Sequence, residues 1–431
     1  LSSSSNHTPI NGELGSFYRP DGLLANSDLK WETTISRNLG LDFGFLNNRI
    51  NGSLEIYWNT TKDLLMAVPV DNTTGYSYQF QNFGKTSNRG IELSLNFDVI
   101  NKGDFRFNIG AIYNYNRNKL DELPNADQYL YSSYWGSSSL VPTNDYMFVE
   151  GKAIGLVRGF VSEGFYTVND FRYENGQYIL KEGIPDITKA LTATYMHPFN
   201  IPNGQTAFPG AAKFRDVNNS GTVDLDDATC LGEVMPRHTG SFQLNFNYKN
   251  FDLSSNFNWT AGGKVYNVAA MINASGQEFD GIGAQRTSWV ADTYKVYNVN
   301  SSGDLYAVTD PNELNALNAN AKYHLPYHQS GITSSEWLED GSYLRLQTLT
   351  LGYTLPHTVL NKIHIEKLRI YLTATNLFTI TGYSGIDPEV NATPTGQSGF
   401  YSNLRVFPTL NMDFGTYPRA RTFTLGANIT F

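Results

Sequence analysis

Apolar and polar side chains alternate along several long stretches of this chain, with a period of two residues. Successive side chains of a β-strand point to opposite faces, so this period indicates strands rather than helices. Two stretches show the pattern: Ile50, Leu54, Ile56 and Trp58 alternate with Asn51, Ser53, Glu55 and Tyr57, and Phe423, Leu425, Ala427, Ile429 and Phe431 alternate with Thr422, Thr424, Gly426, Asn428 and Thr430. The pattern predicts eleven strands, over residues 31–46, 49–66, 77–99, 104–118, 142–150, 154–167, 238–249, 251–264, 341–355, 367–381 and 418–431.

The length of these stretches separates two kinds of antiparallel sheet. A soluble β-sandwich also has one apolar face, but its strands usually run about 5–6 residues. Most stretches here run about ten residues or more, the length with which a tilted strand crosses a hydrocarbon core. Their polar positions hold Asn, Ser, Thr, Gln and Gly more than Lys and Glu, which suits a hydrated lumen. Aromatic residues near the strand ends are placed to form interfacial girdles: Tyr57, Trp58, Tyr113, Tyr115, Tyr248 and Trp259.

The connections between the strands alternate between short and long. The short ones lie at Asn47-Asn48, Asn101-Lys102-Gly103, Gly151-Lys152-Ala153, Lys249-Asn250 and around Pro356, and the long ones at 67–76, 119–141, 168–237, 265–340 and 382–417. Outer-membrane barrels have short periplasmic turns and long extracellular loops. We therefore expect an all-β fold, an antiparallel transmembrane β-barrel in which residues 1–30 form an extracellular segment and residues 31–431 form strands and loops.

Eleven strands do not close such a barrel. Single-chain bacterial barrels have an even number of strands, and an open sheet edge is not viable in lipid. We therefore expect this chain to be a C-terminal portion whose cylinder is closed by other polypeptide. The residues from Leu1 to His7 have neither the basic nor the apolar region of a secretory signal, which agrees with that expectation.

Composition excludes several classes of function. Charged residues make up 16% of the 431 residues, below the roughly 25% of an average soluble domain. The net charge of −9 argues against nucleic acid binding. A single cysteine, Cys230, excludes an intrachain disulfide and a cysteine-based zinc site. The chain contains no Walker-type phosphate loop, no zinc-protease motif and no nucleophile elbow, and we expect no enzymatic activity.

Several segments, in order along nearly the whole chain, resemble the C-terminal half of SusC/RagA-type TonB-linked outer-membrane transporters. They are Leu29-Lys30-Trp31-Glu32, Asn38-Leu39-Gly40-Leu41-Asp42-Phe43, Ile50-Asn51-Gly52-Ser53-Leu54-Glu55-Ile56-Tyr57, Asn88-Arg89-Gly90-Ile91-Glu92-Leu93, Lys213-Phe214-Arg215-Asp216-Val217-Asn218, Tyr343-Leu344-Arg345-Leu346, Leu351-Gly352-Tyr353-Thr354-Leu355-Pro356, Thr375-Asn376-Leu377-Phe378, Gly385-Ile386-Asp387-Pro388-Glu389 and Pro418-Arg419.

The resemblance implies a 22-stranded barrel in the outer membrane of a Gram-negative bacterium. It also implies an N-terminal plug, which this chain lacks, a SusD-like surface lipoprotein as a lid, and import of an oligosaccharide or a peptide driven by TonB. The implied partners are thus the N-terminal half of the barrel with its plug, the lipoprotein, TonB, outer-membrane lipid and the substrate. Two alternatives remain: a non-transporting surface protein, acting as an adhesin or an assembly scaffold, and a soluble sandwich lectin.

One segment, residues 216–227, fits the twelve-residue spacing of a calcium-binding loop. The expected oxygen ligands are Asp216, Asn218, Ser220, the carbonyl of Thr222, Asp224 and Asp227, with Gly221 at the sharp turn. The last position holds Asp where such loops usually hold Glu, and the flanks do not indicate two long helices. The sequence predicts a structural Ca²⁺ site, and the alternative is an Asn/Asp/Gly-rich surface turn.

Two further sets of residues are candidates for function. Tyr131, Tyr134 and Trp135 lie in a predicted extracellular loop, where their rings either stack on a sugar substrate or pack against the lid or a neighbouring loop. Phe431 ends the chain after apolar residues at alternate positions, which resembles the signal that the barrel-assembly machinery reads. The alternative for Phe431 is an ordinary lipid-facing residue.

Overall fold

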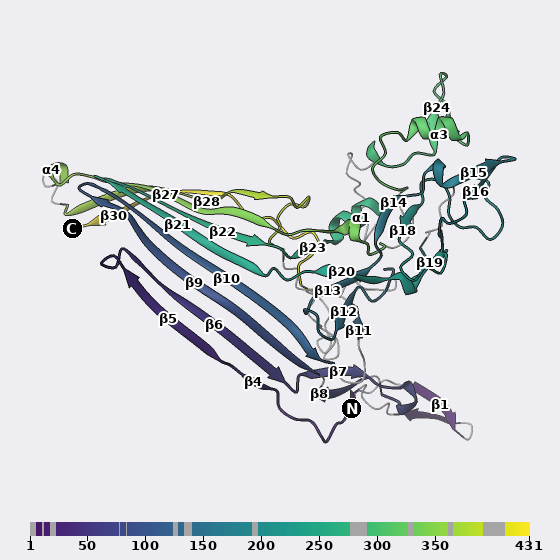
Figure 1. Ribbon diagram of the computed structural model, residues 1–431, viewed down its shortest axis with the longest axis horizontal. Helices are drawn as coiled ribbons and strands as arrows, with labels where there is room; N and C mark the ends of the chain where they lie inside the picture. Colours follow the sequence, from purple (N-terminus) through teal and green to yellow (C-terminus); the bar gives the residue numbers. More distant parts are fainter. Residues whose placement is uncertain are drawn as a thin grey trace.

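The computed structural model describes residues 6–10, 13–17, 23–76, 78–82, 84–123, 128–132, 140–191, 197–275, 291–325, 331–360, 365–390 and 410–431. One large antiparallel sheet dominates it, and Figure 1 shows its long strands side by side. The strands are β4 (Thr33–Ile35), β5 (Asn38–Phe45), β6 (Ile50–Lys62), β9 (Lys85–Lys102), β10 (Phe105–Glu122), β21 (His238–Tyr248), β22 (Phe251–Ala261), β27 (Tyr343–Thr354), β28 (Lys367–Thr381) and β30 (Thr422–Thr430). Among the described residues this sheet does not close on itself, as a partial barrel requires.

The order of the strands follows the chain, as in an up-and-down barrel. From one edge the order is β30-β28-β27-β22-β21-β10-β9-β6, and both β4 and β5 pair with β6 as two pieces of one strand position. Tight turns join the hairpins, with left-handed backbone at Asn47 and Asn48 (φ 55° and 66°), Gly103 (φ 58°) and Lys249 (φ 52°). The short helix α4 (His357–Leu360) lies between β27 and β28. The all-β, antiparallel fold expected from the sequence is confirmed.

Two of the eleven predicted barrel strands are wrong. Residues 142–150 and 154–167 do not join the large sheet. They contain the short strands β12 (Tyr146–Val149) and β13 (Leu156–Gly159) of a separate four-stranded sheet, whose order is β11-β12-β13-β20. The reason is that Tyr146, Met147 and Phe148 are buried at consecutive positions, whereas a barrel strand exposes every second side chain to lipid. The turn Gly151-Lys152-Ala153 therefore lies at the same end of the sheet as the long connections.

Outward and inward rows of the large sheet differ as a membrane barrel requires. Outward positions carry exposed apolar side chains such as Leu39 (65% exposed) and Leu425 (77% exposed). Inward positions carry amides and hydroxyls that bond across strands. The amide of Asn258 donates to Oε1 of Gln347 over 2.6 Å, and the hydroxyl of Ser254 donates to Oδ1 of Asn245 over 2.8 Å. The inner wall is thus a hydrogen-bonded polar surface.

Aromatic rings cover glycines on neighbouring strands at several positions of the sheet. Tyr57 pairs with Gly90, Trp259 with Gly240, and Tyr371 with Gly426. A Cβ atom added at Gly90, Gly240 or Gly426 would come within 2.4 to 2.7 Å of the ring opposite it. Only glycine leaves room for the ring to lie on the backbone, so each ring fits one site on its neighbour.

The remaining elements form a layer at the end of the sheet that carries the long connections (Figure 1), which we call the extracellular layer. Its strands are β7 (Leu65–Pro69), β8 (Tyr78–Asn82), β11 (Gln128–Tyr131), β12, β13, β14 (Ser162–Phe165), β15 (Phe171–Glu174), β16 (Gln177–Leu180), β17 (Asp186–Ile187), β18 (Ala212–Phe214), β19 (Thr222–Val223), β20 (Thr229–Glu233), β23 (Lys264–Asn267), β24 (Tyr297–Val299), β25 (Leu305–Ala307), β26 (Leu338–Asp340) and β29 (Met412–Asp413). Its helical turns are η1 (Asn72–Thr74), η2 (Val168–Asp170), α1 (Val268–Ser275), η3 (Leu225–Asp227), α3 (Pro311–Leu317) and η4 (Ser335–Trp337). The N-terminal strands β1 (Asn6–Ile10) and β2 (Glu13–Phe17) form a hairpin, and β3 (Leu23–Leu24) pairs with β8.

Two aromatic-rich cores hold the extracellular layer together. One includes Phe160, Tyr166, Tyr178, Phe199, Phe208, Tyr294 and Leu314, and the other includes Tyr146, Phe148, Val157, Tyr266, Trp337 and Met412. Each core joins residues more than a hundred positions apart in the sequence. No helix within the described residues is long and apolar enough to cross a membrane.

Candidate functional site at the barrel mouth

A buried arginine, Arg345, lies on the inner face of β27 close to the extracellular layer. Its row is opposite to that of Leu344 and Leu346, and its partner on β28 is Thr379. A bulge follows at once, because the pairing with β28 skips from Leu346 to Thr348. The Arg345 side chain is only 2% exposed, so its charge must be matched by the residues around it.

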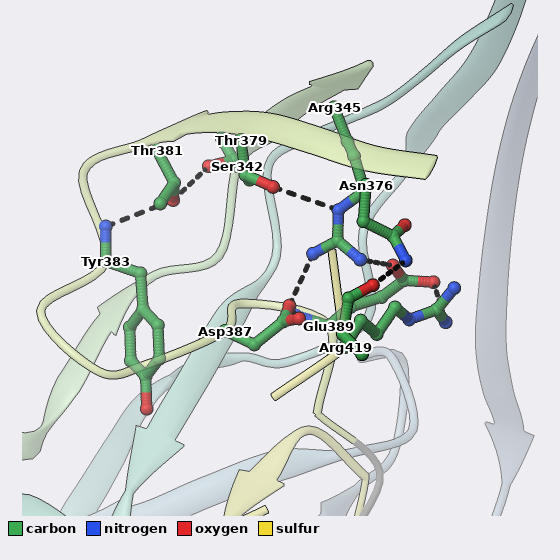
Figure 2. A network of polar contacts seen from close by, with 10 residues as sticks. Ser342, Arg345, Asn376, Thr379, Thr381, Tyr383, Asp387, Glu389 and Arg419 are labelled. Atoms are coloured by element: carbon green, nitrogen blue, oxygen red, sulfur yellow. Dashed lines mark hydrogen bonds and ion pairs between the residues drawn. The ribbon is translucent and has the colours of Figure 1, made fainter. Parts of the chain in front are cut away.

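Two carboxylates of the last long connection surround the guanidinium of Arg345, as Figure 2 shows. Its Nη2 lies 2.5 Å from Oδ1 of Asp387, and its Nη1 lies 2.9 Å from Oε2 of Glu389. Its Nε donates to Oγ1 of Thr379 over 3.0 Å. Oε1 of Glu389 lies 2.6 Å from Nη2 of Arg419, just before β30. The four charged groups therefore form one network, which joins the barrel wall to both arms of the connection between β28 and β30.

A second set of contacts fixes the same two arms further out. The hydroxyl of Tyr383 donates to Oδ2 of Asp413 over 2.6 Å, and both residues are buried. Ser384 donates its backbone N–H and its hydroxyl to the carboxylate of Glu339, each over 2.7 Å. The strand β29 on the second arm pairs with β23, which also pairs with β26. The described parts of 382–417 are thus folded onto the barrel mouth from both ends.

The energetics of the Arg345 network favour a positioning role for it. A buried ion pair adds little net stability compared with apolar residues of the same shape, but the loss of one partner costs about 3–5 kcal/mol because it leaves a buried charge unmatched. Asp387 also accepts the backbone N–H of Glu389 over 2.9 Å, which fixes the turn that carries both carboxylates. The charges of this network are matched in one arrangement of the loop arms, so the network holds the arms in that arrangement.

Sequence reasoning missed this network, although it named all its parts. Arg345, Asp387 with Glu389, and Arg419 lie in three of the segments that carry the family resemblance. They meet because β27, β28 and β30 are neighbours in the sheet. The available signal was an arginine on the inner face of a strand otherwise lined by neutral polar residues, since a charge there requires a partner.

The predicted calcium loop folds as a closed turn at the edge of the extracellular layer. Asp227 is fully buried, and its carboxylate accepts the N–H groups of Val217, Asn218 and Asp224 over 2.7 to 3.2 Å. Asp216 accepts the N–H groups of Ser220 and Gly221.

The other predicted ligands of that loop are also engaged. Asn218 accepts the N–H of Ser220, Asp224 accepts the N–H of Asp226, and the hydroxyl of Ser220 donates to the carbonyl of Thr222. No group of three or more His, Cys, Asp or Glu side chains in the described ranges is arranged to hold a metal ion. All six predicted ligands thus lie in one turn, with their oxygens bonded within it.

An ion pair lies three residues before this turn in the chain. Nζ of Lys213 on β18 lies 2.7 Å from Oδ1 of Asp170 in η2, and both side chains are less than 20% exposed. Burial alone would raise the pKa of Asp170, but hydrogen bonds from Lys213 and Thr167 outweigh it and hold that pKa below its usual range. Asp170 is therefore ionised at neutral pH.

Of the three aromatic candidates, the structure describes Tyr131 alone. Tyr131 is 3% exposed, and its ring packs 4.6 Å from that of Phe148 and 5.6 Å from that of Tyr146. This burial, together with the charge of Asp145, raises the pKa of Tyr131 above its ordinary value. Tyr134 and Trp135 lie outside the described residues. Phe431 is 87% exposed and continues the outward row of β30.

The chain belongs to the TonB dependent receptor-like β-barrel family, whose sequence profile matches residues 3–377. It is therefore part of an outer-membrane protein of a Gram-negative bacterium, as the resemblance implied. It is 30% identical over 407 residues to TonB-dependent receptor P3 of Formosa agariphila, covering 94% of this chain and 35% of that protein. It is 27% identical over 414 residues to TonB-dependent receptor SusC of Bacteroides thetaiotaomicron, covering 94% of this chain and 32% of that protein.

Solved structures show the same fold. The RagAB peptide transporter matches 98% of this chain and 38% of its own chain, with 21% identity and a TM-score of 0.63. This chain thus spans about a third of the length of the relatives it matches.

Proposed function

We propose that the protein containing this chain imports a large nutrient, an oligosaccharide or a peptide, across the outer membrane by a TonB-dependent mechanism. The observation that carries the proposal is the sheet itself, in a chain of the TonB-dependent receptor family: apolar outward, polar inward, and covered at one end by the extracellular layer. One solved structure with the same fold is a peptide transporter, which supports a peptide as one of the two candidate substrate classes.

In this proposal the chain's own residues bind and position, and no covalent step is required. The extracellular layer provides a rigid receptor surface, because its cores are closed and the last loop is fixed at both ends. A SusD-like surface lipoprotein covers that layer, and the N-terminal part of the protein supplies the plug and the contact with TonB. If the segment around Tyr131 binds substrate, Tyr134 and Trp135 are the residues to test, since Tyr131 is buried in a core.

Uptake by living cells tests the proposal. A strain without the gene receives the full-length gene, and accumulation of labelled oligosaccharides and peptides is measured with and without TonB. We expect TonB-dependent accumulation of one class, and co-purification of a lipoprotein. Surface attachment of the label without accumulation would instead support the adhesin or scaffold alternative.

We also propose that the loop 216–227 binds Ca²⁺ with a structural role. The six oxygen donors lie in one closed turn at the spacing that calcium loops use, and calcium prefers such oxygens. Binding requires the predicted ligands, Asp227 included, to direct oxygens that are now bonded within the turn toward the ion. The bound ion would fasten a long connection that is costly to order.

Limited proteolysis of the full-length protein tests the calcium proposal. We expect chelation to increase cleavage within residues 205–235, and the double variant Asp216→Asn/Asp224→Asn to be cleaved equally with and without calcium. Asp304→Asn, an exposed acid elsewhere in the layer, serves as the control and should keep the calcium response. Equal cleavage of the wild-type protein under both conditions would contradict the proposal.

A further inference from the structure

Two arginines lie opposite each other on the outward face of the sheet, where its apolar belt ends. On β9 the outward row runs from Phe97 through Leu95, Leu93 and Ile91 to Arg89, and on β10 it runs from Phe105 through Tyr113 and Tyr115 to Arg117. The pairing of the strands places Arg117 directly opposite Arg89. Both side chains are exposed. The two strands lie inside the sheet, away from its free edges.

This juxtaposition of like charges is unfavourable without an anion. Directly opposite residues on paired strands have Cβ atoms about 4.5–5.5 Å apart, and like charges at that distance repel each other. Neighbouring basic residues have their own partners: Lys85 lies 2.9 Å from Glu122, and Lys119 lies 3.3 Å from Asp121. Within the described part of the chain, neither Arg89 nor Arg117 has an ion-pair partner.

The height of the two arginines matches the headgroup region of the outer leaflet. The outward row from Phe105 to Tyr115 spans ten residue steps. At about 3.4 Å per step and a tilt of about 40°, this corresponds to roughly 26 Å along the membrane normal, close to the roughly 25 Å apolar band of such barrels. Arg117 lies one outward position beyond that band. Trp58, opposite Arg89 on β6 and 40% exposed, has the amphipathic ring typical of the interface.

We propose that Arg89 and Arg117 together bind a phosphate group on the headgroup of an outer-leaflet glycolipid. A guanidinium presents a planar fork of donors that matches phosphate oxygens in a bidentate manner, and two forks side by side suit one phosphate. The acyl chains of the same lipid lie along Ile91 and Tyr115 below. The bound phosphate offsets the repulsion between the arginines and fixes the height of the barrel in the membrane. This site is independent of the imported substrate.

The test uses the full-length protein purified in detergent, with lipid A as the probe and native mass spectrometry as the readout. We expect the wild-type protein to retain lipid A, and Arg89→Gln/Arg117→Gln to reduce the retained fraction about tenfold or more, because each basic side chain near a membrane surface contributes to anionic lipid binding. The control Arg172→Gln/Arg215→Gln removes two exposed arginines of the extracellular layer that lie near Glu174 and Glu163, and it should retain lipid A as the wild type does.

Further arms identify the group that is bound. The wild-type protein should retain dephosphorylated lipid A as weakly as the Arg89→Gln/Arg117→Gln variant retains lipid A. Millimolar inorganic phosphate should not displace lipid A from the wild-type protein. Arg89→Lys/Arg117→Lys keeps the charge but loses the forks, and should show intermediate retention. Heat-modifiable mobility on gels verifies that each variant is folded. Equal retention of lipid A by wild type and the Gln variant, or displacement by inorganic phosphate alone, would overturn the proposal.

Discussion

The large sheet and the extracellular layer obtain their structure in different ways. The sheet consists of strands of up to 18 residues whose order follows the chain, and its apolar side chains face lipid. The layer consists of strands of two to five residues, and its apolar side chains are buried in two cores built from distant segments. Backbone hydrogen bonds between strands therefore stabilise the sheet, whereas side-chain packing stabilises the layer. Mutations should therefore affect the two regions differently.

Truncation of a core residue should show the largest difference. Phe160 in the layer is fully buried, and Phe160→Ala should destabilise the layer by about 3–5 kcal/mol through lost burial and a cavity. Limited proteolysis of the full-length protein should detect new cleavage in the layer, while the heat-modifiable mobility of the barrel stays unchanged. Leu372→Ala, on the lipid-facing side of β28 and 47% exposed, is the control, and new cleavage of the layer in this variant would contradict the comparison.

Loss of the buried arginine at the junction should have the next largest effect. Arg345→Gln leaves Asp387 and Glu389 without their buried counterion, and should cost about 3 kcal/mol, the lower end for a broken buried pair because Glu389 is partly exposed. Hydrogen exchange should increase in residues 382–390 and 410–419 and remain low in β27. Arg369→Gln removes an ion pair with Asp252 that lies wholly within the sheet, so it should leave those loop arms protected. Equal exchange in both variants would show that Arg345 does not hold the loop.

Two glycines on the inner face of the sheet provide a smaller effect. A Cβ atom at Gly352 would lie 2.5 Å from both Nη2 of Arg369 and Oδ1 of Asp252, whereas at Gly110 the nearest atom would be 3.4 Å away. The ends of the Arg369 and Asp252 side chains must shift to admit the methyl group, so Gly352→Ala should destabilise the barrel by about 1 kcal/mol, the low end of the overpacking range, and Gly110→Ala by less. The urea concentration at which the barrel loses its heat-modifiable mobility measures both.

Acid should weaken the layer through protonation of Asp170, and this is the smallest effect that we expect. The pKa of Asp170 is lowered in the folded protein, so its contribution to stability is present above its unfolded pKa of about 3.9 and is lost as the pH falls through the folded value. Protease resistance of the layer should fall below about pH 4. In Asp170→Asn the free energy of unfolding of the layer at neutral pH should be lower by about 1 kcal/mol. The loss of protease resistance that protonation of Asp170 causes should be absent from this variant. An unchanged acid profile in the variant would exclude Asp170 as its source.

The same difference between the regions explains how much the sequence predicted. Alternation identified the sheet and its short turns, because each long strand repeats one local rule. It misassigned residues 142–150 and 154–167, because Tyr146, Met147 and Phe148 are buried on both faces and carry no alternation. The pairing of Arg345 with Asp387 and Glu389 depends on which strands become neighbours, which a single sequence does not specify residue by residue. The oxygen ligands of the predicted calcium loop were found together because they are local.

The rings that cover Gly90, Gly240 and Gly426 matter for how the barrel is assembled. A register shift of one residue turns the apolar side chains of a strand toward the lumen and its polar side chains toward lipid, which is strongly unfavourable. A register shift of two residues keeps the apolar side chains toward lipid, so contact with lipid does not disfavour it. The slip would, however, press Tyr57, Trp259 or Tyr371 onto a residue with a side chain, where the ring has no space. These rings therefore disfavour register shifts of two residues while strands are added to the barrel during assembly.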